Sequence, residues 1–183
     1  FFSAQMGLVS LFDERRQGTL GRILAGPVKP WTVLGGKLLG GFVQGMLAMT
    51  VLVVATTLLI GASWGSPLGV ALVCTAAVIA ALGISTLVIS FTNSAEVAGA
   101  ASSAVAITLG VLGGTFSPTA QGPEIMGTIA LFTPHGWFMR GLGDMQGGGT
   151  AADGLQSVGV LLAMGLITGG VGMARARRLV KAR

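Results

Sequence analysis

Charged residues are concentrated in one short segment of this chain. Seven of the 17 (11 basic plus 6 acidic) lie between positions 13 and 37, and the segment from 38 to 95 contains none. The charged segment has the sequence DERRQGTLGRILAGPVKPWTVLGGK. In its central part, Leu20, Ile23 and Leu24 share one helical face and Arg22 points away from it. This pattern predicts a short amphipathic helix with an exposed charged face; the alternative is a basic loop in contact with lipid headgroups.

Residue types for nucleotide binding or catalysis are missing where that chemistry needs them. A phosphate-binding loop has a glycine, four residues, then Gly-Lys and a Ser or Thr. The pair Gly36-Lys37 has Trp31 at the first glycine position and Leu38 at the hydroxyl position. His135 has no second His, Cys or carboxylate at ligand spacing. We therefore expect no catalytic residue, no metal site and no cofactor bound by this chain.

The composition predicts a protein whose solvent is mostly lipid. The mean hydropathy is +0.82, 52% of residues are hydrophobic and 9% are charged, whereas about 25% are charged in a soluble domain. The net charge of +5 does not favour nucleic acid as a partner, because the basic residues lie at the ends of apolar runs without interleaved aromatic residues. We therefore expect membrane lipid to surround most of the protein.

Four uncharged stretches are long enough to cross a bilayer as helices, which takes about 20 apolar residues. They predict an all-α integral membrane protein, a polytopic helical bundle. The third stretch is so rich in Ala, Gly and Ser that we expect it inside the bundle. Residues 1–12 are apolar and run directly into the charged segment, so we expect them to be the end of a span that begins earlier. The four predicted spans are 38–60, 69–91, 97–117 and 154–174.

The basic residues predict which side each segment faces. Segment 13–37 contains five Lys or Arg residues, and the tail 175–183 contains another five. Four crossings separate the two clusters, so both are expected on the same side of the membrane. Lys and Arg gather on the cytoplasmic side. The sequence therefore predicts a multi-pass protein of the cell membrane with both basic clusters in the cytoplasm.

Segment 118–150 is predicted to be an outer hairpin between the third and fourth spans. Its apolar pieces are too short to cross, and backbone at membrane depth must be helical or buried against protein. We expect two short helices that lie in the outer leaflet or dip into it, hinged at Pro134; the alternative is an ordinary surface loop. Pro118 and Trp137 are the other residues assigned to this hairpin.

Small residues recur four positions apart along the predicted spans. In lipid, this spacing lets helix backbones approach closely. The pattern predicts a tightly packed bundle and carries no information about a substrate. The pairs are Gly36/Gly40, Gly41/Gly45, Gly110/Gly114 and Gly165/Gly169.

Taken together, these motifs resemble the ABC-type-2 exporter permeases. In that family an acidic-basic cluster is followed by Gly-Thr-Leu, a short apolar helix, a Pro, and Gly-Lys at the head of the next span. The stretches LGGTFSP and LFTPHGWFMRGL are similar to the family's outer-segment motifs. The resemblance assigns to an ATPase-binding coupling segment, 13–30, the residues Asp13, Glu14, Arg15, Arg16, Gly18, Thr19, Leu20, Arg22, Ile23, Leu24 and Pro27.

The resemblance implies six spans, of which the first and most of the second would precede this chain. It also implies a permease half that pairs with a second permease subunit, identical or different, and with cytoplasmic ABC ATPase subunits that bind ATP and Mg²⁺. The expected cargo is a small hydrophobic drug or a lipid-like molecule, and the family provides no shared motif for substrate-binding residues. One alternative is a membrane anchor that assembles other proteins without transporting anything. An ion-coupled carrier is disfavoured, because such carriers place ionisable residues within their spans and none of the four predicted spans contains an Asp, Glu, Lys, Arg or His residue.

Overall fold

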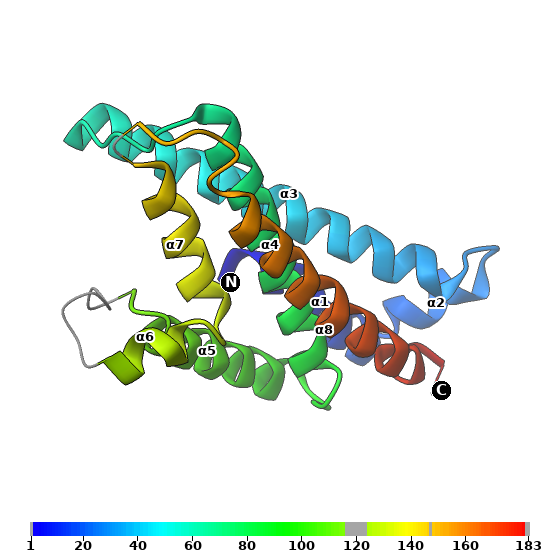
Figure 1. Cartoon of the computed structure of the whole chain (residues 1–183). Helices are drawn as coiled ribbons and strands as arrows, with labels where there is room; N and C mark the ends of the chain where they lie inside the picture. The colour runs from blue at the N-terminus through cyan, green and yellow to red at the C-terminus, as the bar shows by residue number, and fades with distance from the viewer. Residues whose placement is uncertain (1, 116–123, 147, 182–183) are drawn as a thin grey trace.

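The computed structural model describes residues 2–115, 124–146 and 148–181, and the regular structure of these residues is entirely α-helical (Figure 1). Long helices run beside one another, and three short helices connect or flank them. In chain order the helices are α1 (Phe2–Arg16), α2 (Thr19–Ala25), α3 (Pro30–Ile60), α4 (Pro67–Ile89), α5 (Ala95–Leu112), α6 (Glu124–Ala130), α7 (Pro134–Met145) and α8 (Leu155–Lys181).

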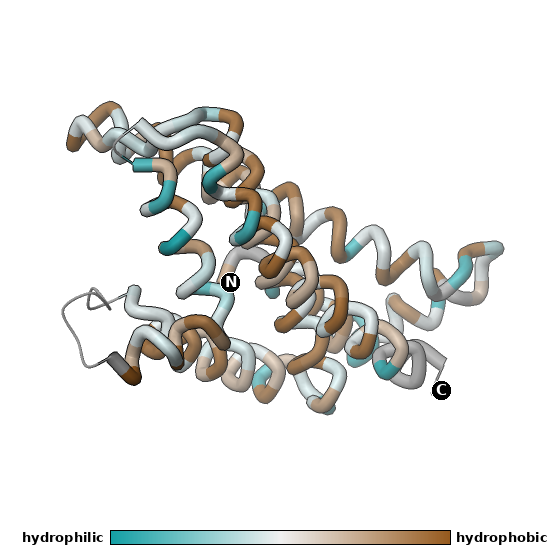
Figure 2. Tube along the Cα trace, viewed as in Figure 1, coloured by the Kyte–Doolittle hydropathy of each residue, from teal (hydrophilic) through white to brown (hydrophobic). Residues whose placement is uncertain are grey.

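Among the described residues, α3, α4, α5 and α8 are long and apolar enough to cross a membrane. Figure 2 shows hydrophobic and neutral residues along most of their length. The fold class predicted from the sequence, an all-α polytopic membrane protein, is confirmed. Three boundaries differ from the predicted spans by five residues or more. Helix α3 begins at Pro30 instead of 38, so Lys37 lies inside the helix. Helix α5 ends at Leu112 instead of 117, and α8 continues to Lys181 instead of ending at 174.

Local capping explains where several helices begin. Ser66 precedes Pro67 at the start of α4, and its hydroxyl accepts a hydrogen bond from the Gly69 backbone N–H. Ser94 caps α5 in the same way, accepting from the N–H of Val97 at 3.2 Å. Such caps satisfy backbone donors that have no partner within the helix. Each span therefore has a defined start after a short connection.

Helix α4 is the centre of the bundle. In the most apolar part of α4, 61% of residues are buried, compared with 22% in α5 and 6% in α3. Val73 and Ala80 on α4 form one core cluster with Leu161 on α8 and Met145 on α7. The expectation that the Ala, Gly and Ser-rich third span is interior is therefore wrong. Small residues permit close packing, but neighbours on several sides are needed to bury a helix, and α4 has them.

The most extensive helix contact joins α4 and α8, and glycines bring the two backbones together. A Cβ added to Gly83 would lie 2.1 Å from the Gly165 carbonyl oxygen, and one added to Gly165 would lie 2.7 Å from that of Ile79. Gly169 and Gly172 continue the same approach along α8. Of the predicted glycine pairs, Gly165/Gly169 therefore lies in a helix–helix contact.

An arginine from each of the two basic clusters lies at the same end of the bundle, beside the turn between α4 and α5. Arg16 at the end of α1 lies 3.7 Å from the Glu96 carboxylate at the start of α5. Arg175 near the end of α8 stacks over the Phe91 ring, 4.1 Å from its centroid, just after α4. This common end, called the basic end below, agrees with the predicted same-side placement. Its location in the cytoplasm remains a prediction.

The predicted outer hairpin contains two helices, α6 and α7. Pro134 occupies the first position of α7, where its missing N–H costs nothing. Trp137 is buried and donates a hydrogen bond from Nε1 to the Leu131 carbonyl at 2.7 Å. Helix α7 packs against α4 and α8, so this part is not an ordinary surface loop. Pro118 lies outside the described residues.

Two matched substitutions on α8 test the glycine contact. Gly165→Ala should destabilise the protein by about 1 to 3 kcal/mol, because the added methyl meets the α4 backbone and forces the helices apart. Gly170→Ala should be neutral or stabilising, because nothing lies within 4 Å of its added Cβ and Ala favours a helix over Gly. Thermal unfolding in detergent measures both; equal shifts would contradict the close crossing.

Candidate functional site

The predicted coupling segment begins within α1 and continues into α2. Asp13 to Arg16 form the last turn of α1, and Gly18 then turns the chain with φ of +73°, a left-handed conformation that favours glycine. The Thr19 hydroxyl donates a 3.0 Å hydrogen bond back to the Glu14 carbonyl. This hydrogen bond ties the first residue of α2 to α1.

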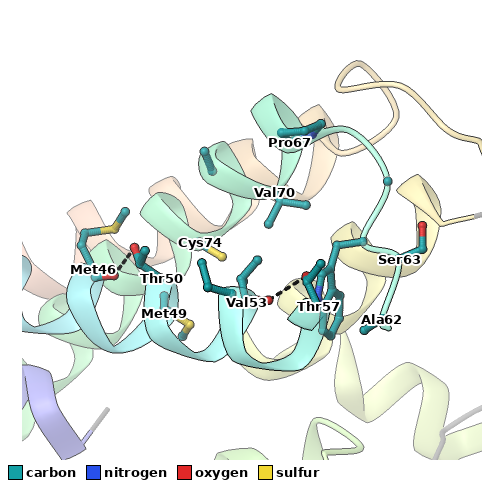
Figure 3. Close-up of a pocket in the computed structure, with 14 residues that line it drawn as sticks. Met46, Met49, Thr50, Val53, Thr57, Ala62, Ser63, Pro67, Val70 and Cys74 are labelled. Atoms are coloured by element: carbon teal, nitrogen blue, oxygen red, sulfur yellow. Dashed lines mark hydrogen bonds between the residues drawn. The ribbon is translucent and has the colours of Figure 1, made fainter. Parts of the chain in front are cut away.

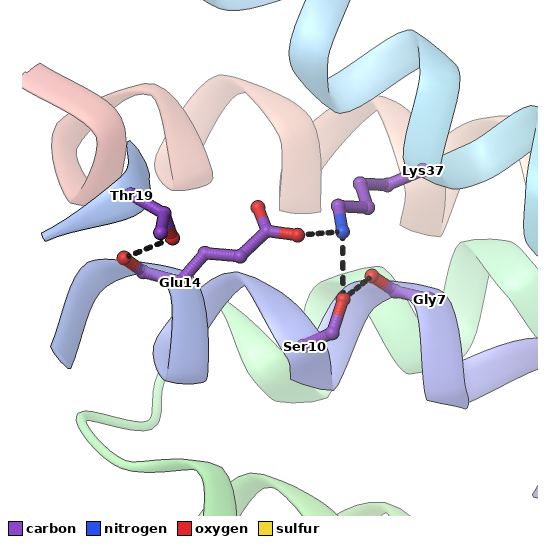
Figure 4. Close-up of polar contacts among 5 residues, drawn as sticks. All are labelled: Gly7, Ser10, Glu14, Thr19 and Lys37. Carbon is purple, nitrogen blue, oxygen red and sulfur yellow. Dashed lines mark hydrogen bonds and ion pairs between the residues drawn. The ribbon is translucent and has the colours of Figure 1, made fainter. Parts of the chain in front are cut away.

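A polar cluster links this joint to α3 (Figure 4). Lys37 on α3 forms an ion pair with the Glu14 carboxylate and donates a 2.8 Å hydrogen bond to the Ser10 hydroxyl. Ser10 in turn donates to the Gly7 carbonyl at 2.9 Å. We call Ser10, Glu14 and Lys37 the α1–α3 polar cluster. It connects the last turns of α1, just before α2, to the first part of α3.

Burial makes this ion pair more important than a surface pair. The Lys37 and Glu14 side chains are 23% and 27% exposed, whereas those of the Arg16–Glu96 pair are 82% and 74% exposed. Water and salt screen exposed pairs, which contribute about 0 to 1 kcal/mol. Removing one partner of a half-buried pair leaves a charge with little compensation. The cluster therefore holds α1 and α3 together at the basic end.

The sequence assigned Glu14 to the ATPase interface and placed Lys37 at the head of a span, but did not pair them. The sequence spacing indicates one half of the cluster: Ser10 and Glu14 are four residues apart and therefore share a face of α1. Their partner Lys37 lies 27 residues beyond Ser10 and 23 beyond Glu14, and only packing reveals the contact. A Cβ on Gly7 would lie 3.0 Å from the Lys37 carbonyl, so this glycine allows the approach.

Two apolar residues of α2 differ in solvent exposure. Leu20 is 5% exposed, whereas Ile23 is 41% exposed and Arg22 is also exposed. Leu20 and Ile23, two of the three apolar residues that the sequence placed on one face, thus have different surroundings. Leu24 belongs to α2, and Pro27 follows it in an exposed connection. Ile23 and Arg22 are therefore exposed on α2 and open to a partner.

A polar cleft of about 600 Å³ lies beside this segment. It separates the last turn of α1 from the turn between α4 and α5. Asp13, Arg15 and Arg16 line one side, and these three predicted coupling residues are exposed. The charged end of α1 and the α4–α5 turn therefore form one concave polar surface. The cleft is lined by Phe12, Asp13, Arg15, Arg16, Asn93, Ser94, Ala95 and Glu96.

An apolar cavity of about 500 Å³ lies between α3 and α4 near the other end of the bundle (Figure 3). Its α3 side includes Met49 and Val53, and its α4 side includes Val70 and Cys74. The connection between the two helices contributes Trp64. We call this space the α3–α4 cavity; the sequence analysis did not predict it, because it depends on how far apart the two helices lie.

A second apolar cavity, of about 440 Å³, lies among α1, α3, α4 and α7. His135 at the start of α7 lines it with Phe138 and Met49. Burial lowers the pKa of the His135 imidazole, which favours the neutral ring near neutral pH. The cavity therefore presents a largely uncharged lining, suited to an apolar molecule.

Comparison with known proteins identifies the family. The model of the ABC-2 family of transporter proteins matches residues 1–174, nearly the whole chain. The chain therefore belongs to the ABC-2 family of transporter proteins: it is a membrane permease component, and a multi-pass protein of the cell membrane.

A relative with an assigned name supports the same class. The linearmycin resistance permease protein LnrN of Bacillus subtilis (strain 168) is 27% identical over 169 residues, which cover 92% of this chain and 44% of the relative. The chain thus spans less than half the length of this relative. No solved structure matches the chain.

Breaking the polar cluster should loosen the joint between α1 and α2. Lys37→Met leaves the Glu14 carboxylate half-buried without its cation, which should cost about 1 to 3 kcal/mol and speed trypsin cleavage after Arg22. Arg16→Met, which breaks the exposed pair with Glu96, is the matched control and should change little. Adding Glu14→Met to Lys37→Met should recover part of the loss. A single Lys37 variant as resistant to trypsin as the parent would contradict this role.

Proposed function

We propose that this chain is the permease subunit of an ATP-driven exporter, powered by a separate cytoplasmic ABC ATPase that binds the coupling segment. Family membership supports a transporter permease. The observation that carries the finer proposal is α2 itself: a short helix at the basic end that is fixed on one side to α1 and exposes Arg22 and Ile23 on the other.

In this proposal the ATPase contacts α2 and the neighbouring polar cleft together. Ile23 is the apolar anchor, and Arg22 and Arg15 are charged contacts at the rim. Truncating a central apolar anchor costs about 2 kcal/mol or more, whereas rim charges usually cost less. Leu20 is a support residue, because it is buried within this chain. ATP and Mg²⁺ would bind the ATPase, and not this chain.

The polar cluster gives a route from the ATPase contact to the membrane helices. Movement of α2 displaces its first residue, Thr19, whose hydroxyl donates a hydrogen bond to the Glu14 carbonyl. Glu14 is paired with Lys37 on α3, so displacement of α2 pulls on both α1 and α3. A rigid chain of contacts of this kind carries a conformational change better than a flexible loop.

The cargo we propose is hydrophobic or amphiphilic, a drug or a lipid-like molecule, carried by two permease subunits that form the path together. The cavity that His135 lines supports this class, since its lining consists largely of apolar residues such as Met49, Val78 and Phe138. The relative's name includes resistance to linearmycin, which is consistent with a role in removing a toxic compound.

Energy supply tests the proposal directly. The purified permease alone should hydrolyse no ATP. Reconstituted with its ATPase in vesicles, the full-length permease should move substrate only when ATP is added. Uphill transport driven by a proton gradient with no ATPase present would instead identify an ion-coupled carrier. Absence of transport under every energy source, with the complex intact, would favour a membrane anchor.

The exposed residue of α2 gives a sharper test. Ile23→Ala should weaken co-purification of the ATPase and reduce export without lowering expression, because Ile23 is exposed in the permease. Leu58→Ala is the matched control, since Leu58 is 78% exposed on α3 away from the basic end. Leu20→Ala should lower the stability of the permease as well. Wild-type ATPase binding and export in the Ile23 variant would refute docking through α2.

A further inference from the structure

The α3–α4 cavity has an opening and a lining that define what can fill it. On α3 its wall runs from Met46 to Thr57, and several of these residues, such as Val54, are also exposed on the outside of the bundle. The cavity therefore communicates with the surface of α3, in whose most apolar part only 6% of residues are buried. None of its lining residues is charged. It is open to lipid and suited to hydrocarbon.

Three polar side chains of the cavity wall already have hydrogen-bond partners. The Thr50 hydroxyl donates to the Met46 carbonyl and the Thr57 hydroxyl to the Val53 carbonyl, each at 2.8 Å. Trp64 donates from Nε1 to the Thr56 hydroxyl oxygen at 3.2 Å. A ligand therefore need not supply a hydrogen-bond acceptor to satisfy them. Two methionines in the wall, which adapt their shape easily, suit a flexible chain.

The length of the cavity matches one leaflet of a bilayer. Residues 46 to 57 of α3 extend over about 16 Å at a helix rise of about 1.5 Å per residue. Half of the roughly 30 Å hydrocarbon core is about 15 Å. At one end lies the connection that carries Ser63 and Trp64, and Trp is enriched at the membrane interface. With Trp64 at the interface, a segment of this length extends to about the middle of the membrane.

We propose that the α3–α4 cavity binds one acyl chain of a membrane phospholipid, with the headgroup beside Ser63 and Trp64. An apolar cavity of this volume is unfavourable if empty, because the groups that line it lose packing contacts. Membrane phospholipid is the hydrocarbon present at the highest concentration beside α3, and the uncharged lining selects for a chain and against a charged group. The bound chain would fill the space between α3 and α4 and steady the outer part of α3.

Photocrosslinking tests this site in the full-length permease–ATPase complex. The complex is reconstituted, without ATP, in vesicles of a phosphatidylcholine with a diazirine midway along one chain. The zwitterionic headgroup avoids attraction to the basic residues. Labels should concentrate in 46–57 and 70–74. Ala71→Trp should fill the cavity and reduce this labelling about tenfold, the factor that corresponds to about 1.4 kcal/mol.

Ala163→Trp is the matched control, because Ala163 is an exposed alanine on α8 that does not line the cavity. In this variant, labelling of the cavity should equal that of the parent.

Equal labelling along all of α3, or no effect of Ala71→Trp, would refute the site. Absence of labels from the cavity in the full-length protein would show that protein covers it. Displacement of the lipid by a transported compound would assign the cavity to substrate. The last two results would also overturn the proposal, but neither bears on ATP-driven export, which is measured separately.

Discussion

Helices in lipid gain little from the hydrophobic effect by packing against one another, so close contact between backbones has to hold such a bundle together. In this protein that contact is the crossing of α4 and α8 at Gly83 and Gly165. A side chain at either position would collide with the backbone of the other helix. Helix α7 packs against both α4 and α8, and the α3–α4 cavity lies along the other side of α4. The other helices are therefore arranged around a contact that requires glycine at both positions.

The basic end combines polar contacts of two kinds. The Arg16–Glu96 pair and the Arg175–Phe91 contact lie near the surface, whereas the Glu14–Lys37 pair is half-buried between α1 and α3. Exposed contacts can exchange with water or a partner at little cost. The half-buried pair cannot, and so it keeps α1 attached to α3. This combination suits a surface where a partner binds on one side and a movement must be passed on.

The two ends of the bundle therefore have different chemistry. The basic end carries a charged cleft and an exposed short helix, which are suited to a protein partner. The opposite end carries the connection with Trp64 and the α3–α4 cavity, which are suited to hydrocarbon. Between them α3 exposes apolar side chains along much of its length, including Leu39, Leu47 and Leu58, as expected of a helix in lipid or in a larger assembly. The proposed coupling of a partner at one end to apolar molecules near the other requires such a division.

The sequence by itself determined the class of this protein. The uncharged runs and the charge concentrated between 13 and 37 predicted membrane helices and a distinct short helix, because helix length and the cost of burying charge act locally. They also predicted that the two basic clusters lie together, since the number of crossings follows from the same runs. Pro134 was assigned correctly to the place where one short helix of the hairpin begins.

Only the tertiary structure decided which helix is central, which partner Glu14 has and where the cavities lie. The Ala, Gly and Ser content of α5 suggested an interior helix, yet α4 is the most buried helix. Burial depends on how many helices surround a helix, whereas its content of small residues indicates only how closely a neighbouring helix can approach. Leu20 and Ile23 are three residues apart on the same predicted face, but one is buried and the other exposed. Lys37 meets Glu14 across two helices. Periodicity specifies the face of a helix, while the identity of what covers that face is a long-range property that no local pattern contains.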